Sequence, residues 1–200
     1  ICHPEFVKRF VPRKSRNGPR KALRVRVAEA ILKKIGFKVQ GALPSHGPYL
    51  LAVAPHTHNI DFLYGLLGTR AMNITPKFLA KKDLLRFPMN LIMRPLGAIS
   101  VDRKNPGGTT ARAAALLNKG HIVALLPKGK RGPGQWKHGL RYMAQETGAK
   151  VYLMSIDHGR KTLTCFGPYE MTGNADLDGL WFASQLQGVT GYVPENTDPF

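Results

Sequence analysis

The chain has 200 residues, 43% of them hydrophobic, which is enough to bury the core of one domain. Its two cysteines, Cys2 and Cys165, exclude a disulfide framework and a cysteine metal site, and they favour a reducing compartment. Thirty Lys and Arg against twelve Asp and Glu give a net charge of +18. No stretch approaches the roughly 20 apolar residues that span a bilayer, so we expect no membrane-crossing helix.

The N-terminal part of the chain is strongly basic. Residues 1–19 mix prolines and glycine with charges and are expected to form an irregular basic arm, followed by one domain over residues 20–200. Twelve Lys and Arg lie within residues 1–40. We favour an anionic membrane or acidic carrier as their partner, because each cation near an anionic leaflet contributes about 1 kcal/mol. Solubility alone and nucleic-acid binding are the alternatives, and the scarcity of aromatic residues in the basic run argues against single-strand binding.

Residues 20–35 are expected to form a helix that ends at Gly36. Apolar residues recur along it at the three- and four-residue spacing of one helical face: Leu23, Val27, Ala30, Ile31 and Ile35. We expect this helix to pack on the core, with a position in a membrane interface as the alternative.

The rest of the chain alternates between strand and helix patterns. Strands are expected near 37–41, 49–54, 77–80, 97–101, 121–126, 150–156 and 161–166. Helices are expected near 59–71, 109–118, 137–146 and 176–187, and a helical stretch broken by Pro88 and Pro95 is expected around 82–95. This alternation predicts a single α/β domain with a largely parallel β-sheet flanked by helices. Ligands of such sheets bind beyond the carboxyl ends of the strands, where His56, Arg103 and the turn at 127–132 are expected to converge.

A histidine and a carboxylate follow the buried strand at 49–53. His56 comes directly after that strand, and Asp61 lies five residues further on. Because five helical residues place two side chains about 140° apart, the pair can meet only if His56 lies in the turn and Asp61 in the first helical turn. An imidazole held by a carboxylate can take a proton from a hydroxyl near neutral pH. The alternative is a plain strand, loop and capped helix.

Two further segments complete a recognisable set. Gly97-Ala98-Ile99-Ser100-Val101-Asp102-Arg103 is a short strand that leads to a basic residue, and Leu125-Leu126-Pro127-Lys128-Gly129-Lys130-Arg131-Gly132 is a strand that leads into a basic, glycine-containing turn. Together with His-x4-Asp, in this order, they resemble the three blocks of the glycerolipid acyltransferase family, which includes the lysophosphatidic acid acyltransferases. The resemblance runs from about Leu23 to about Glu195. It implies the fold of that family over residues 20–200.

The third block departs from the family pattern Pro-Glu-Gly-Thr-Arg. Lys128 stands at the glutamate and Lys130 at the threonine, whereas Gly129 and Arg131 match. If the glutamate holds the loop, a cation in its place leaves a partner unpaired, at a cost of about 1–3 kcal/mol for a buried group. If Lys128 meets a second phosphate instead, it indicates a changed acceptor.

The residue types suggest a mechanism for acyl transfer. His56 is expected to be the general base for a glycerol hydroxyl, and Asp61 to orient and stabilise its imidazolium. Arg103 and Arg131 are expected to hold the phosphate of the acceptor, because paired guanidinium donors match its oxygens. The turn with Lys128 and Gly129 is expected to bind substrate through its charge and backbone N–H groups.

The resemblance also implies the partners. The acyl donor is expected to be acyl-CoA or acyl carrier protein, the acceptor a lysophospholipid or related glycerol phosphate, and no metal or cofactor is required. We expect a peripheral protein of phospholipid biosynthesis on the cytoplasmic face of an anionic membrane, with no nucleic-acid partner. The alternative, which Lys128 raises, is a catalytically weakened relative that binds anionic lipid or acyl carrier without turnover.

Overall fold

The computed structural model of the protein describes most of the chain after the basic arm: residues 23–81, 85–101, 106–128, 132, 136 and 138–197. In chain order the elements are α1 (Leu23–Lys34), β1 (Lys38–Gln40), β2 (Tyr49–Ala54), α2 (Ile60–Ala71), β3 (Lys77–Lys81), α3 (Asn90–Met93), β4 (Ala98–Val101), α4 (Pro106–Asn118), β5 (Ile122–Leu125), α5 (Gly139–Thr147), β6 (Lys150–Asp157), β7 (Thr162–Tyr169) and α6 (Ala175–Leu186), with a short 3-10 turn at Pro194–Asn196.

The strands form one sheet of order β1-β7-β6-β2-β5-β3-β4. All neighbours pair in parallel except β6 and β7, which are consecutive in the chain and antiparallel. The central strand β2 therefore lies between β5 and β6, and all three end at the same edge of the sheet. The predicted single α/β domain with a largely parallel sheet is confirmed.

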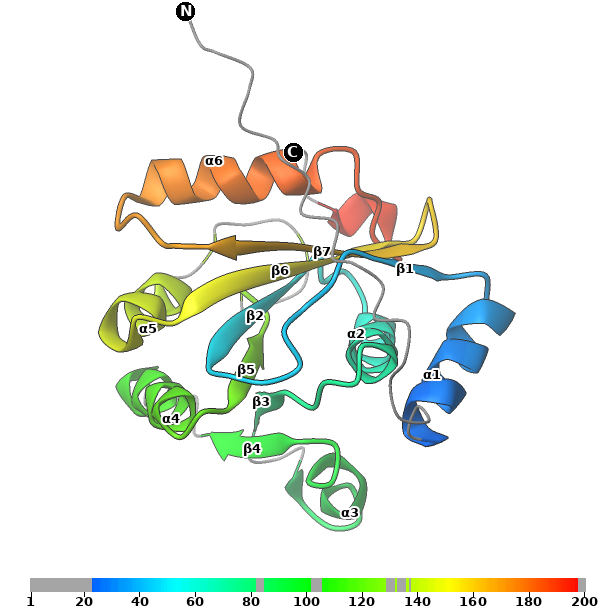
Figure 1. Ribbon diagram of the computed structural model, residues 1–200, viewed down its shortest axis with the longest axis horizontal. Helices are drawn as coiled ribbons and strands as arrows, with labels where there is room; N and C mark the ends of the chain where they lie inside the picture. The colour runs from blue at the N-terminus through cyan, green and yellow to red at the C-terminus, as the bar shows by residue number, and fades with distance from the viewer. Residues whose placement is uncertain are drawn as a thin grey trace, which may run out of the picture.

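Helices cover both faces of this sheet (Figure 1): α1 and α2 lie on one side, and α4, α5 and α6 on the other. The side chains of β2, which point alternately to the two faces of the sheet, show why both faces need a cover. Leu50 and Ala52 point into the cluster that α4, α5 and α6 share, whereas Tyr49 and Leu51 point to the opposite face. All four are at most 3% exposed, as expected for a central strand that is covered on both sides.

Two expected elements differ from the structure. The helix expected at 82–95 is reduced, within the described residues, to the single turn α3 at Asn90–Met93. Pro88 explains this, because it lacks an N–H donor and disfavours helical backbone at the residue before it. The helix expected at 109–118 instead begins at Pro106, where the fixed φ of proline suits a first helical position.

The face that α1 buries was also predicted wrongly. Val25, Ala28 and Leu32 are buried, at 2–3% exposure, and they share the three- and four-residue spacing of the stripe that the sequence had favoured. The stripe itself points to solvent, as its exposed fractions show: Leu23 74%, Val27 48%, Ile31 41% and Ile35 37%. Helix α1 thus has two apolar sides, of which one packs on the domain. Among the described residues, no helix combines the length and apolar character needed to cross a membrane.

Candidate active site

His56 and Asp61 occupy the turn that links β2 to α2. His56 follows the end of β2, and Asp61 is the second residue of α2, as the spacing required. The Nδ1 atom of His56 lies 3.5 Å from Oδ2 of Asp61, in a site where the two side chains are 14% and 2% exposed. That nitrogen is buried and has no formed hydrogen bond among the described residues. The two side chains therefore face each other slightly beyond hydrogen-bond distance, and a small rotation of the ring would close the gap.

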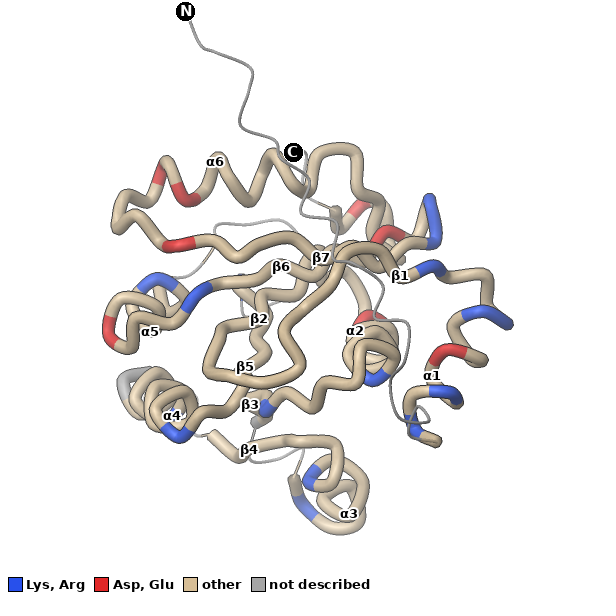
Figure 2. The backbone as a smooth tube through the Cα atoms, viewed as in Figure 1, with Lys and Arg blue, Asp and Glu red and all other residues tan. Residues whose placement is uncertain are grey.

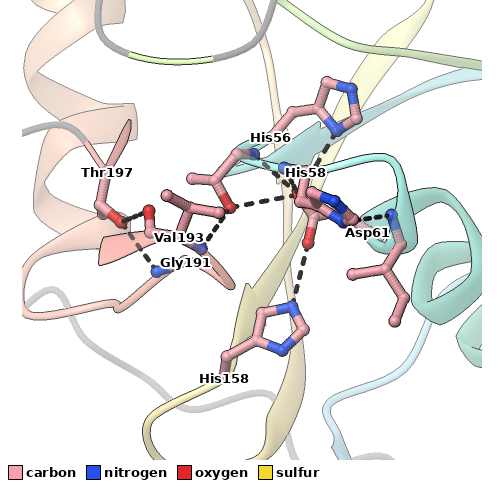
Figure 3. Close-up of polar contacts among 9 residues, drawn as sticks. His56, His58, Asp61, His158, Gly191, Val193 and Thr197 are labelled. Carbon is pink, nitrogen blue, oxygen red and sulfur yellow. Dashed lines mark hydrogen bonds and ion pairs between the residues drawn. The ribbon is translucent and has the colours of Figure 1, made fainter. Parts of the chain in front are cut away.

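The carboxylate of Asp61 is the centre of the site (Figure 3). Its Oδ2 accepts the backbone N–H of Thr57 at 2.7 Å and that of His58 at 2.8 Å. Its Oδ1 lies 3.0 Å from Nε2 of His158. Burial by itself acts to raise the pKa of Asp61, but the hydrogen bonds from His158 and the two amides, together with the nearby His56 ring, outweigh burial and hold this pKa well below its usual range. Asp61 is therefore ionised at neutral pH.

His158 is a site residue that the sequence analysis missed. It directly follows β6, which pairs with β2 in parallel, so the two strands deliver His158 and His56 to the same edge. His158 forms a hydrogen bond with Asp61, although the two residues lie 97 positions apart in the sequence. The rule that identified His56, a polar residue just after a buried strand, applies to His158 as well, but no fixed spacing connects a residue after β6 to the β2 turn.

The C-terminal segment packs on the same turn, which the sequence analysis also missed. Thr57 is 2% exposed, and its Oγ1 accepts the backbone N–H of Val193 at 3.2 Å. Gly191 lies against Thr57 so closely that a Cβ atom would come within 2.3 Å of the Thr57 methyl group. The N–H of Gly191 in turn donates to Oγ1 of Thr197 at 2.9 Å. The residues after α6 therefore hold the His56 turn in place from outside.

Lys128 lies on the other side of His56, just after β5. Its side chain is 9% exposed, and Nζ donates to the carbonyl of Gly132 at 3.5 Å. The N–H of Gly132 donates to the carbonyl of His56 at 3.2 Å. Lys128 thus contacts Gly132, and Gly132 in turn is bonded to the histidine backbone. His56, Lys128 and Trp136 share the lining of a small cavity between them.

The remaining predicted site residues are not all described. Arg103, Gly129 and Arg131 lie outside the described residues, so their contacts are not part of this geometry. His58 is exposed, and its Nδ1 accepts the N–H of Ile60 at 3.2 Å, which is a local capping contact rather than a position facing the cavity. Over the described ranges, no group of three or more His, Cys, Asp or Glu is arranged to hold a metal ion.

Comparisons with known proteins agree with this fold. No curated protein sequence matches the chain. The crystal structure of the 1-acyl-sn-glycerophosphate (LPA) acyltransferase PlsC from Thermotoga maritima is similar, with a TM-score of 0.57 at 20% identity over 81% of this chain and 74% of that chain. The family model described as acyltransferase matches residues 34–157, more than half of the chain, which includes the His56 turn, Lys128 and the end of β6. The prediction of a glycerolipid acyltransferase is confirmed at the level of family and fold, and the chain belongs to the acyltransferase family.

Proposed function

We propose that the protein is an O-acyltransferase that moves a fatty acyl group from acyl-CoA or acyl carrier protein to the hydroxyl of a lysophospholipid or related glycerol phosphate. The observation that carries this proposal is the pairing of His56 with an ionised, buried Asp61 at the carboxyl ends of the central strands. Such a pair can remove a proton from an alcohol and stabilise the resulting imidazolium. Family membership supports acyl transfer as the reaction, and the PlsC neighbour supports a lipid acceptor.

In this mechanism the acceptor is the nucleophile. Nε2 of His56 takes the hydroxyl proton while the hydroxyl oxygen attacks the thioester carbonyl. The tetrahedral intermediate then expels the thiolate, which takes the proton back from the imidazolium, so that one ester and one thiol form. Arg103 and Arg131 are proposed to hold the acceptor phosphate, with Gly129 and its turn providing N–H groups for the oxyanion. No protein nucleophile is consumed in this scheme.

Lys128 fits an active enzyme better than a weakened relative. A cation at the position of the family glutamate would be costly if it were buried without a partner. Lys128 is buried but donates to the carbonyl of Gly132, so it can close the 128–132 turn itself. We therefore favour turnover over binding alone, with Lys128 adding positive charge to the cavity that His56 lines.

Incubation of the purified protein with labelled acyl-CoA or acyl carrier protein and a panel of lysophospholipids tests this function. We expect ester and free thiol to appear in equal amounts, with one donor and one headgroup preferred. Thiol without ester would indicate a thioesterase. Saturable binding of donor and acceptor without either product would favour the weakened relative instead.

We further propose that the protein acts peripherally on an anionic membrane, on its cytoplasmic face. The solvent-exposed apolar stripe of α1, defined by Leu23, Val27, Ile31 and Ile35, supports this proposal. Basic segments are visible along the same helix in Figure 2, and the sequence of α1 gives its basic residues as Arg24, Arg26, Lys33 and Lys34. An apolar face bordered by cations has the composition of a helix that lies in a lipid interface.

Vesicle sedimentation tests the membrane proposal. Binding should rise with anionic lipid content and fall with salt, because the Debye length shortens from about 30 Å at 0.01 M to about 3 Å at 1 M. The double change Val27→Asp and Ile31→Asp should weaken binding, whereas Leu180→Asp on α6, an apolar site that is even more exposed at 66%, should not. Deletion of residues 1–19 measures the contribution of the basic arm separately. Equal binding by the α1 variant and the wild-type protein would refute a role for the stripe.

A further inference from the structure

His158 makes a direct contact with the proposed catalytic pair. Its Nε2 lies 3.0 Å from Oδ1 of Asp61, while His56 and the two amides use the other oxygen, Oδ2. One carboxylate is therefore shared by two imidazoles, one on each oxygen (Figure 3). The side chain of His158 is 11% exposed, so this contact is largely shielded from water.

The direction of this hydrogen bond follows from the charge of Asp61. A carboxylate whose pKa is held well below its usual range is ionised at neutral pH, and an ionised carboxylate only accepts. Nε2 of His158 must therefore carry the proton and donate it to Oδ1. The bond is charge-assisted, which makes it stronger than a bond between neutral groups.

The surroundings of His158 hold its ring in one orientation. Three aromatic rings meet the imidazole edge-on, with centroid distances of 5.5 Å for Phe37, 4.8 Å for Tyr64 and 5.2 Å for Tyr192. The backbone N–H of His158 donates to the carbonyl of Thr190 at 2.8 Å. Among these neighbours only the two tyrosines titrate, and burial, followed by the charges of Tyr192 and Asp61, raises the pKa of Tyr64. At neutral pH Asp61 is thus the charged group in contact with the ring.

We propose that His158 is a positioning residue for acyl transfer, which fixes Asp61 by its Nε2–H so that the opposite carboxylate oxygen faces His56. The proposal rests on the function proposed above. A ring clamped by three aromatic side chains is a fixed donor, and it prevents rotation of the carboxylate away from Nδ1 of His56. Such a residue is expected to affect the chemical step more than substrate binding, because it acts through Asp61.

Two substitutions distinguish the role of the His158 N–H donor from that of the packing of its ring. His158→Phe keeps an aromatic ring among Phe37, Tyr64 and Tyr192 but removes the N–H, and it should lower kcat about 10²-fold with KM little changed, as misplaced catalytic groups do. His158→Gln removes the ring but can still donate an N–H, so it should keep more of the activity than His158→Phe. His121→Phe, at an exposed histidine, is the matched control. Melting temperatures confirm that each variant is folded.

A double-mutant cycle shows whether His158 acts through Asp61. In an Asp61→Asn background, His158→Phe should cost less than about twofold further in kcat, because the carboxylate that it positions is already gone. If His158→Phe lowers kcat by the same factor in the Asp61→Asn background as in the wild-type background, the proposal is overturned. A folded His158→Phe enzyme with wild-type kcat would overturn it as well. A larger loss in His158→Gln than in His158→Phe would assign the effect to packing and would overturn it too.

A spectroscopic measurement keeps this inference separable from the proposed function. Nitrogen-15 NMR of the imidazole should show His158 as the Nε2–H tautomer at neutral pH in the wild-type protein. The Nδ1–H tautomer would refute the contact even in an active enzyme. If the wild-type protein transfers no acyl group to any acceptor, the proposed function fails, while the tautomer still shows whether His158 donates to Asp61.

Discussion

Replacement of Asp61 by asparagine tests the reasoning about the site most directly. The asparagine oxygen is expected to take the place of Oδ2, where it can still accept the N–H groups of Thr57 and His58. Its NH₂ group then faces Nε2 of His158, donor against donor, and the negative charge beside His56 is lost. The hydrogen bonds from the amides of Thr57 and His58 are then no longer charge-assisted, and the hydrogen bond from His158 is broken. The free-energy cost of burying a charged carboxylate is also removed. We therefore expect a loss of about 1–3 kcal/mol in the free energy of unfolding.

The effect on catalysis should be much larger. Without the carboxylate, His56 has no group to orient its ring or to stabilise its positive charge, so kcat should fall by about 10²–10⁴-fold. Acyl transfer from acyl-CoA at saturating acceptor measures this loss, and urea unfolding measures the stability. Asp61→Ala is the comparison, because it leaves the N–H groups of Thr57 and His58 without their acceptor and should be less stable than Asp61→Asn. A folded Asp61→Asn enzyme with near wild-type kcat would refute the assigned role of the carboxylate.

The lowered pKa of Asp61 also predicts how the stability difference between the wild-type protein and Asp61→Asn depends on pH. The pKa of Asp61 is lowered by folding, so its contribution to stability is complete above the unfolded value of about 4 and is lost as pH falls through the folded value. Asp61→Asn has no such group. Unfolding measured from pH 7 downwards should therefore show the wild-type advantage shrinking below about pH 4. An advantage that grows on acidification would contradict the sign of the shift.

The other site residues give three further predictions. His56→Ala should lower kcat by about 10²–10⁴-fold in an acyl-transfer assay with little loss of stability, whereas His58→Ala should retain activity; the reverse result would mean that the wrong histidine had been assigned. Arg103→Ala and Arg131→Ala should each lower kcat/KM for the acceptor by the equivalent of about 1.5–3 kcal/mol while donor binding stays constant, and an unchanged acceptor dependence would refute phosphate anchoring. Lys128→Met should destabilise the 128–132 turn and reduce activity more than Lys128→Arg, as measured by unfolding and kcat; equal effects would mean that the charge of Lys128 is not used.

The sequence was sufficient for the sheet and for the His56 turn because both depend on local pattern. A buried strand at 49–54 reads as a continuous apolar run, and a five-residue spacing admits only one arrangement in which His56 meets Asp61. The strand-end rule also placed Lys128 near His56, since Lys128 follows β5, the neighbour of β2. These features need only short stretches of chain and the parallel order of strands.

Periodicity alone could not choose between the two apolar sides of α1. The side with Val25, Ala28 and Leu32 and the side with Val27 and Ile31 both recur every three or four residues. Only contact with α2 and the sheet decides which side is buried, and that contact depends on tertiary packing. The larger residues of the exposed side therefore indicated the wrong face.

The contacts around Asp61 explain why the His-x4-Asp spacing is only a part of the site. One oxygen accepts N–H groups from the His56 turn itself, which the spacing determines. The other oxygen accepts from His158, which reaches it because β6 is the parallel neighbour of β2. Thr57 is held in addition by Val193, far along the chain. An isolated peptide with the same spacing would have two of these constraints at most, so the orientation of Asp61 beside His56 is a property of the whole sheet edge. It follows that substitutions at His158 should change catalysis through this carboxylate, and substitutions at Gly191 through Thr57, although both residues are remote in sequence from the motif.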